Sequence, residues 1–231
     1  MRYLLLSILA LCYCTSIHAQ DQYATINEQL KQYPTDEEKL TFLDSITESK
    51  EVAKDRPLKI KLAKQTIRLA RKLENFDVVA KKSRFVLQDL NTRNLQDSVI
   101  ILANALIAKK DKLKDSSSLA HVYLKRAGAL YKQAKHTKAI VDYEKAAVIF
   151  EANDKPLFAA DGYFFAGQSY LLTHQYATSI TQMKKALELY ELGGDLTYVQ
   201  YVAGSLSNLY DRIGFLEMIF ARHILYLVNQ Y

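Results

Sequence analysis

An internal repeat limits the folds that are open to this chain. Residues 134–146 read AKHTKAIVDYEKA and residues 174–186 read HQYATSITQMKKA, with isoleucine, lysine and alanine in register. The same step gives isoleucine four times and then phenylalanine, at Ile60, Ile100, Ile140, Ile180 and Phe220. Other apolar columns lie three or four positions apart, which is the spacing of one helix face. The period, about 40 residues, is typical of helical arrays and predicts a repeated pair of helices, here called helix A and helix B.

Composition points to the same class of fold. The 231 residues include only seven Gly and three Pro, and an all-β chain with many tight turns would need more of both. Polar linkers that contain Pro156 or the pair Gly193-Gly194 mark the ends of the helices. We therefore expect an all-α chain, a right-handed α-solenoid of about five antiparallel helix pairs across residues 37–231. Its units cover about residues 40–79, 80–119, 120–159, 160–199 and 200–231, after a lead-in segment at 20–36.

Residues 1–19 have the layout of a secretory signal peptide. Arg2 precedes an apolar run from Tyr3 to about Tyr13, and small and polar residues follow. We expect cleavage after about Ala19 or Gln20, and hence export to the periplasm. A retained N-terminal anchor is the alternative. Lipoprotein anchoring is disfavoured because Leu11, rather than a small residue, precedes Cys12. Both cysteines of the chain lie in this segment, so the mature chain has no thiol chemistry.

Charge and hydropathy argue against a nucleic-acid partner and against a membrane span. Loss of residues 1–19 removes Arg2 and no acid, so the formal net charge falls from +6 to +5, far below a nucleic-acid-binding footprint. The longest later apolar run, residues 99–108, has ten residues, whereas a membrane span needs about 20. We expect no nucleic-acid partner and no stable membrane span within residues 20–231. The basic amphipathic stretch 56–72 is interpreted as the solvated face of the first helix B.

No catalytic, cofactor or metal motif is present in the sequence. His121, His136, His174 and His223 lie in different units, without the close helical spacing to acids that a zinc site uses. Phosphate-binding and nucleophile-elbow motifs are also absent. We therefore expect no cofactor, no metal and no enzymatic activity.

Two units carry a recognisable residue pattern. The third gives Tyr123, Ala127 and Leu130, then Ala139, Tyr143 and Ala146; the fourth gives Tyr163, Gly167 and Tyr170, then Ser179, Met183 and Ala186. This pattern resembles the tetratricopeptide repeat, over about residues 37–231. The resemblance implies that these small and aromatic residues pack the helices together. The usual unit has about 34 residues, so we expect longer helices and a looser turn after helix B. HEAT-like stacking, with units of about 40–47 residues, is the alternative.

The resemblance also implies a binding surface on helix A, which lines the concave side of such arrays. Its ligand-facing positions map onto four helices, as Arg84, Gln88 and Asn91; Lys125, Gly128, Tyr131 and Lys132; Phe164, Gln168, Leu171 and Leu172; and Ser205, Asn208 and Arg212. This mixture suits a peptide or partner protein. The carboxylate-clamp arrangement of the family is not reproduced.

The whole layout is similar to the periplasmic N-terminal regions of Bacteroidetes membrane sensor proteins. The primary hypothesis is an exported interaction scaffold. The alternative is the sensory input region of a transmembrane signalling protein, a histidine kinase or transcriptional regulator whose output part is absent here. Residues 224–228 form an apolar end where a terminal repeat normally has a polar cap, so pairing through Ile224–Val228 is a further expectation.

Overall fold

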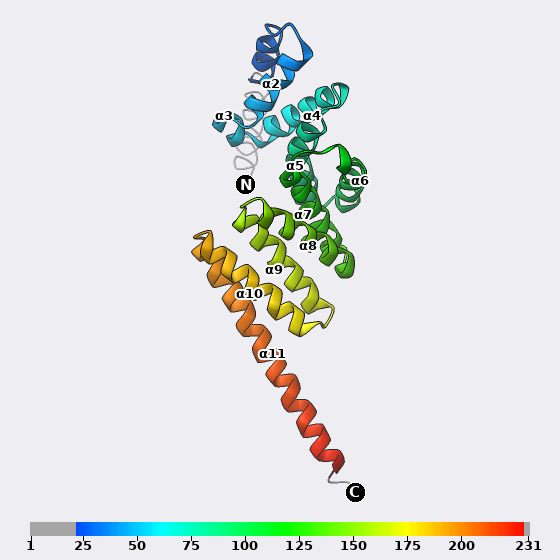
Figure 1. The fold of residues 1–231 in the computed structure, drawn as a ribbon, viewed down its shortest axis with the longest axis vertical. Coiled ribbons are helices and arrows are strands. Elements are labelled where there is room, and N and C mark those ends of the chain that lie inside the picture. The colour runs from blue at the N-terminus through cyan, green and yellow to red at the C-terminus, as the bar shows by residue number, and fades with distance from the viewer. Residues whose placement is uncertain (1–21, 229–231) are drawn as a thin grey trace, which may run out of the picture.

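The computed structural model describes the backbone of residues 22–228 and the side chains of residues 22–214, and every regular element in that part is helical (Figure 1). The all-α solenoid expected from the repeat is confirmed. The expected signal peptide at residues 1–19, its cleavage point, and the expected pairing through the side chains of Ile224–Val228 lie outside what is described.

The helices follow one another as α2 (Asp36–Thr47), α3 (Lys50–Lys54), α4 (Arg56–Lys72), α5 (Phe76–Thr92), α6 (Gln96–Ile107), the short 3₁₀ helix η1 (Lys110–Lys112), α7 (Ser116–Lys132), α8 (His136–Ala152), α9 (Pro156–Leu172), α10 (Tyr176–Leu192) and α11 (Leu196–Val228). Residues 22–30 are also helical. Helix A of successive units corresponds to α2, α5, α7, α9 and the start of α11. Helix B corresponds to α4, α6, α8 and α10.

The helices keep a constant step along the chain. From α2 onward they begin at positions 36, 56, 76, 96, 116, 136, 156, 176 and 196, with only the short α3 and η1 outside this register. The helices α4, α5, α7, α8, α9 and α10 each have 17 residues.

Three-residue turns connect most of these helices. The middle residue of six turns has a positive φ, at Glu74, Asn94, Ala134, Asp154, His174 and Gly194. In each turn the next amide donates back to the helix, as Lys135 does to Leu130 O and Gln175 to Tyr170 O. This is the Schellman closure.

These turns correct one expectation. The residues beyond the usual repeat length lie in the helices, and the turn after helix B is as short as the turn within a pair. The Schellman closure explains this, because the same three-residue geometry ends both kinds of helix. A longer connection is present only between α6 and α7, where α6 has 12 residues and η1 follows it.

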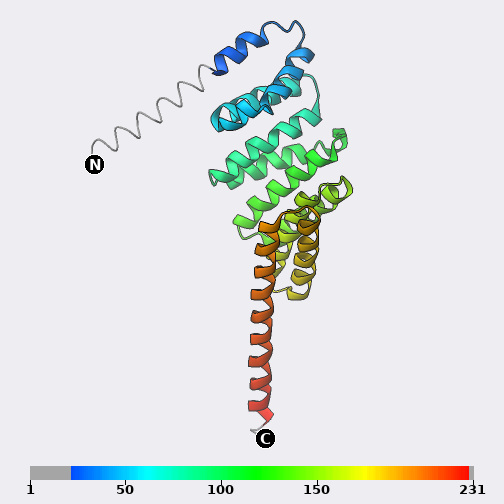
Figure 2. The same cartoon turned by 90° about the vertical axis from the view of Figure 1, so that its left-hand side faces the viewer.

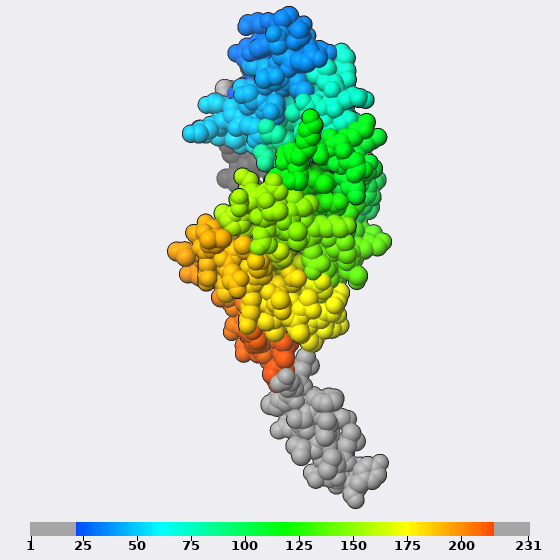
Figure 3. Space-filling model, in the orientation of Figure 1, coloured from blue at the N-terminus to red at the C-terminus, as the bar shows by residue number. Residues whose placement is uncertain are grey.

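Most helices pack mainly against their neighbours in the chain, and α5 also packs against α7. The array is elongated, with α2 at one end and α10 and α11 at the other (Figure 2, Figure 3). The expected packing residues Tyr123, Ala127, Ala139, Tyr143, Ala146, Met183 and Ala186 are all buried. Tyr163 and Tyr170 are half-buried, and their hydroxyls donate to Glu151 and Glu144 at 2.8 Å.

Two glycines of α9 allow close helix contact. A Cβ on Gly167 would lie 2.8 Å from Met183 Cγ and 3.2 Å from Ser179 O, both on α10. A Cβ on Gly162 would lie 2.8 Å from Ala147 Cβ and 3.0 Å from Ala147 N, on α8. The sequence pattern predicted a packing role for Gly167 but not for Gly162. The absence of a side chain at Gly162 allows α9 to approach α8 closely.

A buried lysine joins the first two helix A elements. The side chain of Lys82 on α5 has no exposed surface, and its ammonium donates to the main-chain oxygen of Asp44 at 2.7 Å and to Glu48 at 2.9 Å. Lys81 and Arg84 pair with the same two carboxylates, at 3.0 Å each. Burial would raise the pKa of Asp44 and Glu48, but hydrogen bonds from the lysines outweigh it and hold both below their usual range. The network thus ties α2 to α5.

The fifth unit differs from the prediction of a helix pair at residues 200–231. The helix α11 runs without interruption from Leu196 to Val228 and extends beyond α9 and α10 (Figure 1). Gly214 falls one helix step after Gly194, in the column of the positive-φ turn residues, but α11 continues through it. Each of the six turns has at least one polar residue beside its middle residue, whereas Gly214 is flanked by Ile213 and Phe215. Lacking such polar residues, this segment continues the helix.

Within the described part of the chain, no helix is long and apolar enough to cross a membrane.

Candidate functional site

Three of the expected ligand-facing residues meet in one cavity of about 360 Å³ on the helix A face. Arg84 and Gln88 come from α5, and Lys125 comes from α7. We call this cavity the helix A groove; its full lining is Arg84, Phe85, Gln88, His121, Leu124, Lys125, Phe158 and Asp161. Residues three or four apart on one helix share a face, so α5 contributes 84, 85 and 88, and α7 contributes 121, 124 and 125.

The cationic groups of the groove are incompletely satisfied. Lys125 donates to Gln88 Oε1 at 2.6 Å, and no ion pair to it is recorded among the described residues. Burial lowers the pKa of Lys125, an effect that nearby Asp161 opposes. Arg84 pairs with Glu48 through Nη2, but its Nε is buried without a hydrogen-bond partner in the described structure. The ammonium of Lys125 can therefore donate to a further oxygen ligand, whereas the Nε of Arg84 is enclosed by protein atoms.

Asp161 on α9 provides the acidic group. It accepts a hydrogen bond from the Tyr190 hydroxyl at 2.5 Å. Burial raises the pKa of Asp161, and the bond from Tyr190 and the charge of Lys125 limit the rise. The groove thus places a carboxylate, which accepts hydrogen bonds, near Arg84 and Lys125, which carry positive charge.

His121 forms an apolar side of the groove. Its ring lies edge-on to the rings of Phe150 and Phe158, with centroids 4.7 Å away in each case. Burial, reinforced by the nearby charges of Arg84 and Lys125, lowers the pKa of His121 to about 4, so the imidazole is neutral at pH 7. Its surroundings are those of a packing residue. Among the described residues no group of His, Cys, Asp and Glu could hold a metal ion.

An aromatic surface continues the helix A face toward α11. We define the aromatic shelf as Tyr131, Phe165 and Tyr201. Phe165 and Tyr201 are exposed by 36% and 61%, and both rings lie edge-on to buried Phe164, at 5.3 and 5.4 Å. Burial, with Tyr201 nearby, raises the pKa of Tyr131. The shelf offers apolar contact area beside the polar groove.

The remaining expected residues divide into three groups. Asn91 and Lys132 bond between helices, since Asn91 Nδ2 donates to Lys125 O at 3.2 Å and Lys132 Nζ to Asn91 O at 3.0 Å. Phe164 is only 1% exposed, so its assignment to the ligand-facing surface is wrong. The others occupy the helix A series outside the groove, as Gly128, Gln168 and Leu171, half-buried; Ser205, half-buried; and Leu172, Asn208 and Arg212, exposed.

Sequence reasoning missed Phe85, His121, Phe158, Asp161, Phe165 and Tyr201. A signal for two of them was available, because Phe85 and Phe165 lie one repeat before and one repeat after Lys125. The helix A face is turned by one position at α9, where Phe164 points into the core and Phe165 outward. A step of 40 residues from Lys125 leads to Phe165, whereas two such steps from Arg84 lead to Phe164, and the second position was the one selected.

No family model matches the chain, and no curated protein matches it in sequence. Solved structures do resemble it. A Rap protein complexed with Competence and Sporulation Factor has a TM-score of 0.63 and 17% identity, over 86% of this chain and 58% of that one. BtubC (BKLC) from P. vanneervenii has a TM-score of 0.55 and 11% identity, over 85% of this chain and 92% of that one. The chain thus spans little more than half the length of the Rap protein. At these identities the similarity concerns the fold, and the fold is that of a tetratricopeptide-like helical repeat array.

Proposed function

We propose that the chain is a non-catalytic interaction scaffold that binds an extended peptide, or an extended segment of a partner protein, along the helix A groove and the aromatic shelf. The observation that carries the proposal is Lys125, a half-buried lysine of the groove that donates to Gln88 Oε1 and for which no ion-pair partner is recorded among the described residues. An ammonium group has three N–H donors, so peptide carbonyl or carboxylate oxygens can take the donors of Lys125 that Gln88 leaves unused.

The rest of the surface supports an extended ligand. Asp161 and Gln88 can accept peptide N–H groups, and the shelf at Phe165 and Tyr201 can pack apolar side chains. Aromatic residues are frequent anchors of binding energy at interfaces. The Rap protein of similar fold was solved in complex with Competence and Sporulation Factor, which supports a binding role for this class of array.

A displayed random-peptide library selected on the full chain tests the proposal. Affinities of the selected peptides are then measured by fluorescence anisotropy on Lys125→Gln and Phe165→Ala variants. We expect each substitution to weaken binding on the order of tenfold. Lys184→Gln, an exposed lysine on α10, is the matched control and should leave affinity unchanged. Equal binding by all three variants would contradict the assignment of the groove and shelf.

We further propose that the protein is exported to the periplasm, because residues 1–19 have the order of charge, apolar run and small residues of a signal peptide. N-terminal sequencing of the protein from fractionated cells tests this, with an expected start at Gln20 or Asp21. The alternative role, sensory input for a transmembrane signalling protein, rests on the layout of the sequence. Its test is the coding sequence after Tyr231, which should encode an apolar run of about 20 residues.

A further inference from the structure

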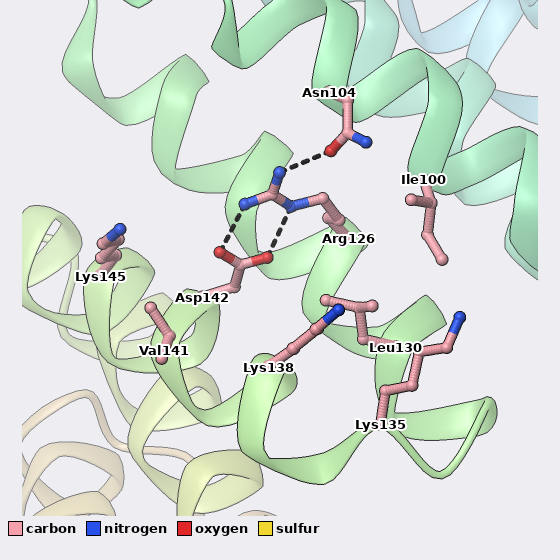
Figure 4. A pocket seen from close by; sticks show the side chains of 9 residues that line it. All are labelled: Ile100, Asn104, Arg126, Leu130, Lys135, Lys138, Val141, Asp142 and Lys145. Atoms are coloured by element: carbon pink, nitrogen blue, oxygen red, sulfur yellow. Dashed lines mark hydrogen bonds and ion pairs between the residues drawn. The ribbon is translucent and has the colours of Figure 1, made fainter.

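A second cavity, of about 410 Å³, lies between α6 and α8 with α7 beneath it. It shares no lining residue with the helix A groove. Its side chains come from α6, α8, the turn between α7 and α8, and positions 126 and 130 of α7 (Figure 4). Its centre is Arg126, whose guanidinium lies between Asp142 and Asn104 (Figure 4).

The guanidinium of Arg126 is held in place by three hydrogen bonds. Nε and Nη2 donate to the two carboxylate oxygens of Asp142 at 2.6 and 2.7 Å, and Nη1 donates to Asn104 Oδ1 at 2.6 Å. Asp142 is almost fully buried, with 3% of its side chain exposed. A guanidinium has five N–H donors, so two have no hydrogen bond among the described residues. Arg126 is therefore fixed before any ligand arrives and still has donors to offer.

Three lysines surround this ion pair. Lys135 donates to the amide oxygen of Gln133 at 2.7 Å. For Lys138 and Lys145 no carboxylate within ion-pair distance is recorded among the described residues, and both are exposed. Four cationic groups, Arg126 and the three lysines, thus face one anion, Asp142, which leaves a local formal charge of +3. Such an excess attracts anions.

The repeat itself shows that packing does not require this charge. One repeat further on, at the junction of α8, α9 and α10, Ala166 stands in place of Arg126 and Thr178 in place of Lys138. The other substitutions are Glu144 for Asn104, Gln175 for Lys135 and Gln182 for Asp142. Lys185, the counterpart of Lys145, is paired with Glu151 at 2.7 Å. The cationic group is therefore absent from the next equivalent junction along the array.

An apolar side of the cavity limits the class of ligand. Ile100 and Leu130 also line it, with Leu130 close to Lys138 and Lys135, and Val141, 46% exposed, lies beside Lys145 and Asp142 (Figure 4). Its volume is in the range of small-molecule sites, about 300–1,000 Å³. We propose that this cavity binds a small organic anion that carries two or more negative charges next to an apolar group. The free donors of Arg126 and the ammonium groups of Lys138 and Lys145 hold the anionic end, and the apolar side chains contact the rest.

Phenyl phosphate is a suitable probe, because it joins a dianion at pH 7.5 to an aromatic ring. Isothermal titration of the full chain at low salt should show one site, with affinity about tenfold higher than for inorganic phosphate. The affinity should fall as salt is added, because the attraction is electrostatic. Equal affinity for the two probes would contradict the apolar contribution, and undetectable binding of both would overturn the site.

Variants distinguish this site from binding to general surface charge. A Lys138→Gln, Lys145→Gln double variant should bind phenyl phosphate about tenfold more weakly, with unchanged thermal stability. Lys185→Gln, the repeat-equivalent control, should bind like the unmodified chain. Lys125→Gln, in the helix A groove, should also leave phenyl phosphate binding unchanged, so failure of the peptide proposal would not affect this one. A loss in Lys185→Gln equal to that in the double variant would overturn the proposal.

Discussion

Lys82 and Gly162 occupy the same position of helix A, two units apart, and they hold their helices by opposite means. Lys82 fills the position with a fully buried side chain that reaches the carboxylates of α2. Gly162 has no side chain, and its backbone approaches Ala147 on α8 so closely that a Cβ would clash. The period of the repeat thus fixes where helices meet, while the chemistry of each contact differs along the array.

Removing the buried lysine should have the largest effect. We expect Lys82→Ala to lower the free energy of unfolding by about 3 kcal/mol, because it leaves Asp44 and Glu48 close together without their shared cation. Urea denaturation followed by circular dichroism measures this. The adjacent Lys81, 37% exposed, is the control, and Lys81→Ala should cost less than about 1 kcal/mol.

Acid titration tests the contribution of Asp44 and Glu48, the carboxylates that pair with Lys82, to the free energy of unfolding. The folded pKa values of Asp44 and Glu48 are lowered, so their contribution to stability is complete above the unfolded values, about 4, and is lost as pH falls through the folded ones. The unmodified chain should therefore lose stability steeply below about pH 4. In Lys82→Ala this loss should be smaller, and identical acid profiles would show that the network contributes little.

Adding a methyl group at the glycine contact should have an intermediate effect. Gly162→Ala places its Cβ against the backbone and Cβ of Ala147, which cannot move as a flexible side chain would. We expect a loss of about 1–3 kcal/mol in the free energy of unfolding. Gly204→Ala is the matched control, since nothing lies within 4 Å of a Cβ there. An equal response at the two positions would mean that α9 does not depend on close contact.

The smallest effects are expected where a turn is compared with an uninterrupted helix. Ala134 has φ +57° in its turn, so Ala134→Gly should stabilise by about 1 kcal/mol by removing the strain of the left-handed region. Gly214 holds the equivalent column within α11, with open space around it, so the reverse change, Gly214→Ala, should also stabilise by about 1 kcal/mol. Thermal denaturation measures both. A loss of stability in Gly214→Ala would indicate a turn at that position in solution.

Much of the fold could be predicted because packing repeats in sequence as well as in space. The columns of Ala127 and Gly167, or of Ala146 and Ala186, record helix contacts directly. The turns were harder to predict, because a small residue such as Ala134 gives no signal of a positive φ. The continuous helix α11 could not be expected from a pattern in which Gly214 stands in the turn column.

The candidate site was predictable only in outline. The helix A face and three groove residues, Arg84, Gln88 and Lys125, follow from the resemblance to the tetratricopeptide repeat. Asp161 and Phe158 do not, because the groove depends on how α9 rotates relative to α7, and neighbouring side chains decide that angle. The buried ion network of Lys82 was equally invisible, since a lysine within a basic stretch is normally solvated.

The three-residue turns have a mechanical consequence. Since nearly every connection is short and closed by hydrogen bonds, the chain holds little spare length between one helix and the next. A force that pulls the two ends apart must first change the angles between successive helices, and only then can a helix unwind. The array can therefore lengthen and recoil while each pair of helices stays intact, and a ligand that spans several helix A elements would stiffen it.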